Sequence, residues 1–136
     1  MEMIREYAIS LGWIVCFLLL ALLARLLFDW ITPGSLREAS EAKNAAVGRV
    51  IRGLYLGLAI ILGAAMYSSH NILAALRDGA IGVVLMLVVY KVYDLMDRRD
   101  FARELHEGNV MLGMEIEGLF ILLSAVIVGA MNYVGG

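Results

Sequence analysis

The chain has 136 residues, of which 62% are hydrophobic, and its mean hydropathy is +0.83. A soluble domain of this size cannot bury so much apolar surface, so the composition excludes ordinary soluble proteins and indicates a protein whose solvent is the lipid bilayer. The formal net charge of −2 says little about partners, and we expect no nucleic acid among them. One cysteine, Cys16, excludes an intrachain disulfide and any multi-cysteine metal site.

The first apolar run extends from Tyr7 to Trp30. At about 1.5 Å per residue it can cross a hydrocarbon core of roughly 30 Å. It is longer than the apolar core of a signal peptide and no small-residue cleavage site follows it, so we predict a retained transmembrane helix. Arg25 lies near its end, where we expect the side chain to extend to the lipid headgroups.

Thr32-Pro33-Gly34 ends this helix, and a capping box at Ser35 to Glu38 predicts a short surface helix that reaches Lys43. The second apolar run extends from Ala45 to Tyr67. It contains Gly53-x-x-x-Gly57, a spacing that allows close helix contacts in lipid, with chance composition as the alternative.

A polar turn of four residues, Ser68 to Asn71, is short enough that the third run, Ile72 to Met96, must return antiparallel to the second. Arg77 and Asp78 predict an ion pair near the membrane surface, and Lys91 is expected to extend to the headgroups. A charged connection then leads to the fourth run, Val110 to Val134.

The two halves of the chain match each other when the sequence is shifted by 65 positions, without gaps. The stretch from Glu107 to Gly118 then aligns with the region around Asn44 to Gly53. Such a match indicates an internal duplication, with one repeat at about 7–68 and the other at about 72–134. We therefore predict an all-α membrane protein of four transmembrane helices, arranged as two parallel helical-hairpin repeats with pseudo-two-fold symmetry along the membrane normal.

The basic residues predict the orientation. Most of them lie at the two connections that follow the first and third runs: Arg25, Arg37, Lys43, Arg49, Arg52, Lys91, Arg98, Arg99 and Arg103. Only Arg5 and Arg77 belong to the opposite side. By the positive-inside rule both charged connections are cytoplasmic and both termini lie outside.

The repeated pattern of an asparagine before a span rich in small residues resembles a known family. It occurs as Asn44-Ala45-Ala46-Val47-Gly48 and as Asn109-Val110-Met111-Leu112-Gly113, and Ile31-Thr32-Pro33 precedes the first copy. The chain is similar over nearly its whole length to the domain of unknown function 350 family. Its second copy departs from the pattern at Val110 and Met111, where alanines are usual. The resemblance implies a four-span protein of the bacterial inner membrane, and the family's gene neighbourhoods hint at envelope maintenance or stress.

The sequence lacks the motifs of catalysis. It contains no Gly-rich phosphate loop, nucleophile elbow or metal-ligand cluster, so we expect no enzyme, no cofactor and no metal. The two histidines, His70 and His106, lie on opposite membrane faces in the predicted topology and cannot act as a pair. His106, beside Glu104 and Glu107, fits a solvated helix end, with a pH-sensitive or metal-contacting site as the alternative.

Charged residues inside two of the spans form the candidate site. Asn44, Gly48 and Arg52 share one helix face, and Asn109, Gly113 and Glu117 share the equivalent face of the other repeat. Arg52 and Glu117 therefore have equivalent positions, and we predict that they pair across the pseudo-two-fold axis. Arg49 and Glu115 offer a second pair. The pair Arg52–Glu117 is either a buried structural salt bridge or part of a polar path for protons or ions.

Two hypotheses for function follow. The first is a non-enzymatic structural or interaction subunit that recruits a cytoplasmic partner through residues 32–43 and 97–108. The alternative is an ion- or proton-conducting subunit that uses the Arg52/Glu117 face. We also expect a homo-oligomer or a hetero-complex with a cytoplasmic or membrane partner, with Gly53, Gly57 and Gly118 as helix-packing positions and one of these small-residue faces, at Gly57, turned toward another subunit.

Overall fold

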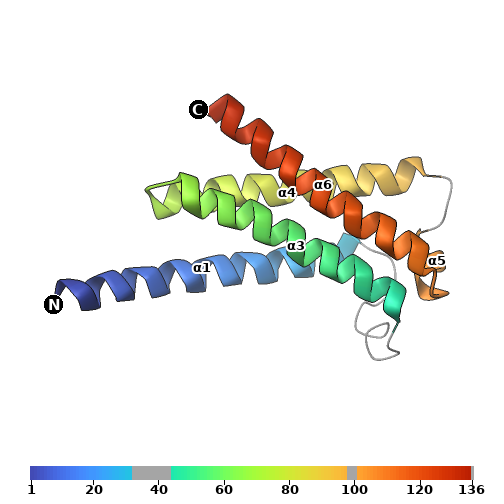
Figure 1. Ribbon diagram of the computed structural model, residues 1–136, viewed down its shortest axis with the longest axis horizontal. Helices are drawn as coiled ribbons and strands as arrows, with labels where there is room; N and C mark the ends of the chain where they lie inside the picture. Colours follow the sequence, from blue (N-terminus) through green and yellow to red (C-terminus); the bar gives the residue numbers. More distant parts are fainter. Residues whose placement is uncertain (32–43, 98–100, 136) are drawn as a thin grey trace.

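The computed structural model describes residues 1–31, 44–97 and 101–135, and all regular elements within these ranges are helices (Figure 1). They are α1 (Glu2–Ile31), α3 (Ala45–Ser68), α4 (Ile72–Met96), α5 (Phe101–His106) and α6 (Val110–Gly135). The turn predicted at residues 32–34 and the surface helix predicted to end at Lys43 lie outside the described residues.

Four of the helices, α1, α3, α4 and α6, are long and apolar enough to cross a membrane. The chain is therefore a multi-pass membrane protein, and the all-α class with four spans is confirmed. The predicted apolar runs fall on these helices, although α1 begins five residues earlier than predicted, at Glu2. The short helix α5 was not predicted, because it lies in the charged connection where apolar periodicity is interrupted.

Helices α1 and α4 run in one direction, and α3 and α6 run in the other (Figure 1). Both termini consequently lie at one end of the bundle, while α5 lies at the opposite end beside the first turns of α3 and α6. The tight turn between α3 and α4 ends at Asn71, whose side chain accepts a hydrogen bond from the N–H of Leu73 at 2.8 Å. This cap starts α4 directly after the turn and makes the two helices antiparallel neighbours.

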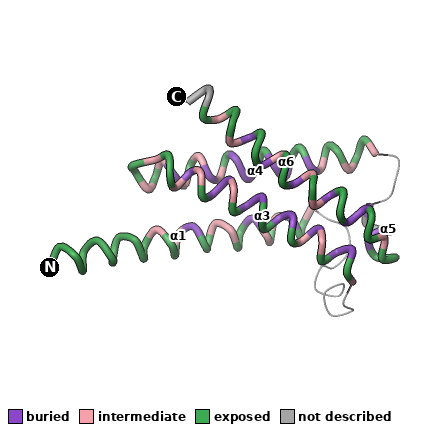
Figure 2. Tube along the Cα trace, viewed as in Figure 1, coloured by how far each residue is buried: buried purple, intermediate pink, exposed green. Residues whose placement is uncertain are grey.

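The centre of the bundle is the contact between α3 and α6, the most extensive contact between any two helices. One stripe of α3 is buried along its length, whereas the first turns of α1 are exposed on all sides (Figure 2). The two helices approach most closely at glycines. A Cβ atom built on Gly53 would lie 2.6 Å from the Cα of Glu117, and one on Gly113 would lie 2.5 Å from the carbonyl oxygen of Ala46.

Three aromatic side chains from three helices fill the middle of the bundle. Phe28 of α1, Tyr90 of α4 and Phe120 of α6 are at most 2% exposed. Their ring centroids are 4.9 Å apart for Tyr90–Phe120, 5.5 Å for Phe28–Tyr90 and 5.7 Å for Phe28–Phe120. These offset and edge-to-face contacts add directional attraction to the burial of large apolar surfaces, so the cluster ties α1, α4 and α6 together.

Two predicted headgroup contacts are instead contacts between helices. The Nη1 atom of Arg25 donates a hydrogen bond to the hydroxyl of Tyr55 at 2.8 Å, and its guanidinium lies 5.6 Å from the Tyr55 ring centroid. The ammonium of Lys91 donates to the carbonyl oxygen of Ile31, the last residue of α1, at 3.1 Å. Both side chains found partners within reach, and the Lys91 contact satisfies a carbonyl that a helix end leaves unpaired.

The first of these contacts has an equivalent in the second half of the chain. Shifting Arg25 and Tyr55 by 65 positions gives Tyr90 and Phe120, which stack on each other between α4 and α6. An aromatic side chain of the second helix is therefore covered by a side chain of the first helix in both halves. This agreement supports the predicted repeat, whose boundaries stay a prediction.

Two glycines differ from their predicted roles. Gly57 is buried, and a Cβ atom there would lie 2.8 Å from the sulfur of Met86 and 3.3 Å from the carbonyl oxygen of Phe120. It packs within the chain, which corrects the expectation that it faces another subunit. Gly118, predicted to pack against a helix, is exposed and has nothing within 4 Å of a built Cβ atom. The close approach of α3 and α6 uses its neighbour Glu117 instead.

Candidate functional site

The two repeated asparagines start the two central helices. The Asn44 side-chain oxygen accepts hydrogen bonds from the N–H groups of Ala46 at 3.0 Å and Val47 at 3.3 Å. The Asn109 side-chain oxygen accepts one from Leu112 at 3.1 Å. Both are therefore helix N-caps, which satisfy N–H groups that have no partner within the helix. Each asparagine was predicted to share a helix face with one residue of the ion pair. That arrangement follows from the spacing of eight residues, and the asparagines themselves cap the first turns of the two helices.

Asn44 also connects α3 to α5. Its amide nitrogen donates to the carbonyl oxygens of Leu105 at 2.7 Å and His106 at 3.3 Å. Phe101 and Leu105, one helical turn apart, are 2% and 5% exposed and attach α5 to the bundle. The spacing of these two apolar residues in a charged segment is the signal from which α5 could have been predicted.

We expect Asn44→Asp to loosen α5 while it preserves the start of α3. The carboxylate keeps the acceptor for the Ala46 and Val47 N–H groups, but it loses the donors and faces two carbonyl oxygens. Limited proteolysis should then cut the 97–108 connection faster than in the wild type. Asn109→Asp is the matched control, because the described contact of its side chain is a cap that a carboxylate can also form. Equal cleavage of the two variants would contradict the tether.

Arg52 and Glu117 form a two-bond ion pair between α3 and α6. The Nε atom of Arg52 donates to one carboxylate oxygen of Glu117, and Nη2 donates to the other at 3.0 Å. Each residue is the eighth of its helix, so the two charges lie at the same level. The planar guanidinium matches a carboxylate in this arrangement, which fixes the relative rotation of the two helices as well as their contact.

The ion pair lies at the surface of the bundle. The Arg52 side chain is 57% exposed and the Glu117 side chain 13% exposed. This corrects the expectation of a buried bridge, because position 52 falls on the outer side of α3 and its long side chain reaches across to α6. Arg49, one turn earlier on α3, is half-buried. Gly48 and Glu115 are exposed, Gly113 is buried against α3, and the pairing of Arg49 with Glu115 stays a prediction.

Removing one charge of this pair should destabilise the protein more than removing both. Arg52→Gln and Glu117→Gln each leave an uncompensated charge among membrane-spanning helices, whereas the double neutral variant leaves none. We expect the exchange Arg52→Glu/Glu117→Arg to restore much of the lost stability. Thermal unfolding of the four variants in bicelles measures this order. If both single variants unfold at the wild-type temperature, the pair does not contribute to stability.

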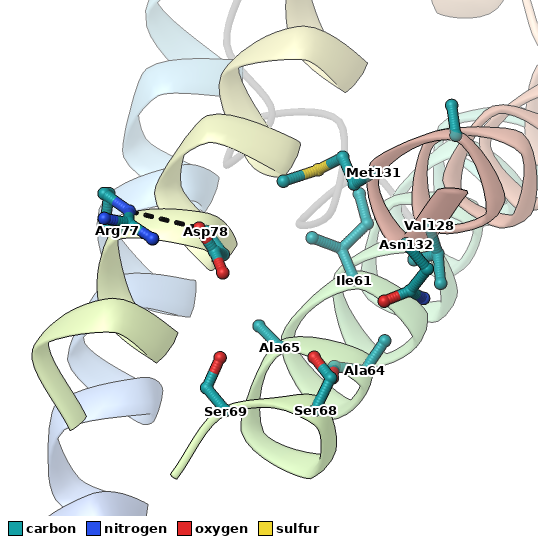
Figure 3. A pocket seen from close by; sticks show the side chains of 11 residues that line it. Ile61, Ala64, Ala65, Ser68, Ser69, Arg77, Asp78, Val128, Met131 and Asn132 are labelled. Atoms are coloured by element: carbon teal, nitrogen blue, oxygen red, sulfur yellow. Dashed lines mark hydrogen bonds and ion pairs between the residues drawn. The ribbon is translucent and has the colours of Figure 1, made fainter. Parts of the chain in front are cut away.

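A cavity of about 630 Å³ lies at the other end of the bundle, between α3, α4 and α6. Apolar residues such as Ile61, Val128 and Met131 line it together with polar residues, which include Ser68, Ser69 and Asn132. Figure 3 shows Asp78 directed into this space from α4, with Arg77 beside it. The Arg77 Nε atom and the Asp78 carboxylate are 3.2 Å apart and their side chains are 68% and 35% exposed, as expected of an ion pair near the membrane surface.

The residues between the ion pair and this cavity are apolar. Leu54, Leu58 and Phe120 are at most 2% exposed and fill the bundle at this level. Ser124 is buried, and its hydroxyl donates to the Ile121 carbonyl oxygen of its own helix at 2.8 Å. Within the described ranges, no group of three or more His, Cys, Asp or Glu side chains could hold a metal ion. The described interior of one chain therefore offers no continuous row of polar side chains across the bundle.

The comparison with known families agrees with this architecture. The family model described as Domain of Unknown Function (DUF350) matches residues 3–131. The chain belongs to the DUF350 family. No curated protein and no solved structure matches it. Because the match covers all four spans of this DUF350 protein except the first residue of α1 and the last residues of α6, the repeated asparagines and the ion pair both lie within the family's domain.

Proposed function

We propose that this DUF350 protein is a non-enzymatic subunit of the bacterial inner membrane that recruits a cytoplasmic partner through its charged connections. Both termini face outward in this proposal, since the basic residues gather at the opposite end of the bundle. The protein assembles further, with copies of itself or with another membrane protein, and serves the maintenance of the cell envelope.

The observation that carries the proposal is the docked helix α5. Phe101 and Leu105 are buried and the backbone of α5 is held by Asn44, while Arg103, His106 and Glu107 point outward. The side chains of Arg103 and Glu107 are 71% and 66% exposed. A connection whose only role is to join α4 to α6 does not need a helix that packs on the ends of the spans. A fixed helix that presents charges of both signs is a preformed surface for a protein partner.

Several observations favour this proposal over the conducting alternative. The interior between the ion pair and the opposite end is filled by apolar and aromatic side chains. A conducting pore needs polar groups or water along its whole length, or a hydrophobic constriction that can be wetted. The described residues of one chain supply polar groups at the two ends, so conduction would have to use a surface between chains.

Photo-crosslinking in cells tests the proposal. A photoreactive amino acid at Arg103 should give a discrete adduct with a cytoplasmic protein, and one at Ser69, at the other end of the bundle, should give none. Phe101→Ala, which removes the main apolar attachment of α5 but keeps its charges, should weaken the Arg103 adduct. An unchanged adduct in that variant, or none from Arg103, would contradict recruitment through a docked α5.

The orientation is tested separately by cysteine labelling. In a Cys16→Ser background, a cysteine at His106 should react with a membrane-impermeant maleimide only after the inner membrane is opened. A cysteine at Ser69 should react in intact spheroplasts. Reversed labelling would place α5 outside and contradict both the topology and the cytoplasmic partner.

A further inference from the structure

The ion pair is the centre of an exposed surface shared by α3 and α6, which we call the ion-pair face. The residues one turn before and after Arg52 are Gly48 and Leu56, and both are exposed. On α6, Met114 and Ile121 flank Glu117 and are 46% and 37% exposed. Helix α4 contacts α3 and α6 elsewhere, through pairs such as Gly82–Ile61 and Tyr90–Phe120. Within the described residues, the ion-pair face is therefore left open.

This face lies within two membrane-spanning helices. Arg52 and Glu117 each follow the first residue of their helix by seven positions, which places them about 10 Å along the helix axis at 1.5 Å per residue. An arginine alone could extend back to the headgroups. Here the Glu117 backbone is held against Gly53, and its short side chain fixes the guanidinium at the same level. The pair is thus kept inside a membrane-spanning segment and at the protein surface.

Within the described residues, the Arg52 guanidinium is incompletely bonded. Arginine carries five N–H donors. Within the described part of the chain, Glu117 accepts from Nε and Nη2, and the remaining donors face outward from a side chain that is 57% exposed. Hydrocarbon offers no acceptors, so an exposed donor at this depth is unfavourable and requires an acceptor from outside the chain.

We propose that the ion-pair face is covered by the same face of a second copy of this chain. Copies inserted in the same orientation place their pairs at one depth only if the two-fold axis is parallel to the membrane normal. The axis then sets α3 opposite α6 of the second copy, so that Arg52 faces the Glu117 carboxylate of the second copy. By the same symmetry, Glu117 faces the Arg52 guanidinium of the second copy. Four charges of alternating sign meet, and each guanidinium gains an acceptor that the described residues of its own chain do not supply.

The apolar surroundings fit such an interface. The exposed apolar side chains of Leu56, Met114 and Ile121 surround the charges. Gly48 has no side chain, so it leaves room for a second copy to approach closely. The inference rests on the proposed function only in taking the protein as a membrane subunit. The inference assigns a second copy of the chain as the partner of the ion pair. Recruitment of a cytoplasmic protein does not require such a dimer.

Disulfide crosslinking in native membranes tests the interface. In the full chain with Cys16→Ser, a copy with Leu56→Cys and a co-expressed copy with Ile121→Cys should form a crosslinked dimer several-fold more than copies with Leu56→Cys and Val126→Cys, because the axis sets Ile121 opposite Leu56 of the second copy. Val126 is a suitable control because it is also on α6, is 57% exposed and lies on a different side of the helix. Equal crosslinking at both positions would overturn the proposal.

The charges are tested in the same background. The double variant Arg52→Gln/Glu117→Gln should lose most of the crosslink between Leu56→Cys and Ile121→Cys copies, whereas the exchange Arg52→Glu/Glu117→Arg should keep it, since alternating signs are preserved. A thermal unfolding curve confirms that each variant is folded. If the neutral variant is folded and still crosslinks fully, the charges do not join two copies, and bound lipid headgroups seen by native mass spectrometry would then identify the acceptor. A variant that no longer forms the crosslinked dimer but still gives the Arg103 photo-adduct would show that the dimer interface and the recruitment of a cytoplasmic partner are independent. Failure of one proposal can then be told from failure of the other.

Discussion

Adding one methyl group at Gly53 is expected to force α3 and α6 apart. The new Cβ atom of Gly53→Ala would lie 2.6 Å from the Cα and 3.1 Å from the carbonyl oxygen of Glu117. Both are backbone atoms, so the strain cannot be relieved by the rotation of a side chain. Overpacking of this kind costs about 1–3 kcal/mol. The expected result is a lower unfolding temperature in bicelles together with a weakened Arg52–Glu117 contact, because both residues lie at the same crossing.

The position 65 residues later supplies the control. Gly118→Ala introduces the same methyl group into the equivalent turn of α6, where nothing lies within 4 Å. Replacing glycine by alanine inside a helix is otherwise favourable by roughly 1 kcal/mol, and this gain is common to both variants. The difference between them therefore isolates the helix contact. A Gly53→Ala variant as stable as Gly118→Ala would show that α3 and α6 do not approach as closely as described.

The sequence predicted the spans and the ion pair for related physical reasons. Long apolar runs have few alternatives to crossing the bilayer, so their number and approximate limits follow from composition. A gapless repeat places equivalent residues at equal depth, and opposite charges at one depth predict a contact. Arg52 and Glu117 were found in this way, and the structure joins them directly.

The sequence could not predict which surfaces the four helices leave open. Gly53 and Gly118 are equivalent by sequence, yet the first is at the helix crossing and the second is exposed. Exact symmetry would have placed both alike, but α4 packs extensively on both α3 and α6 while α1 has much smaller contacts. The exposure of Arg52 follows from the same asymmetry of packing. Local sequence contains no information on it, because it depends on the relative rotation of complete helices.

Contacts between distant residues were missed for a similar reason. Arg25 and Lys91 both lie near helix ends, where an interfacial position is the default expectation. Their actual partners, Tyr55 and the Ile31 carbonyl, come from other helices and become available only when the bundle forms. Arg25 and Lys91 therefore have two roles. They are among the basic residues that predict the orientation, and they also form contacts that hold the helices together.

Truncating Phe120 is expected to have a large effect on stability and none on ion flux. Phe120 is fully buried and its ring packs against the rings of Phe28 and Tyr90. Loss of a buried phenylalanine ring removes apolar contacts and leaves a cavity, which typically costs about 3–5 kcal/mol. Phe120→Ala should therefore unfold at a much lower temperature than the wild type. Leu122→Ala, two residues away at a side chain that is 60% exposed, should change stability little.

The same variant separates the two functions, because Phe120 lies between the ion pair and the opposite end of the bundle. If the interior of one chain were a gated path, removing this ring would shorten the hydrophobic barrier and raise proton or ion flux in proteoliposomes. A structural and interaction subunit predicts no flux above that of empty liposomes from Phe120→Ala protein that is shown to be folded. The measurement is made at a temperature where the variant still gives the wild-type circular dichroism spectrum. A pH-dependent current under those conditions would reject the interaction proposal in favour of conduction through the interior of the bundle.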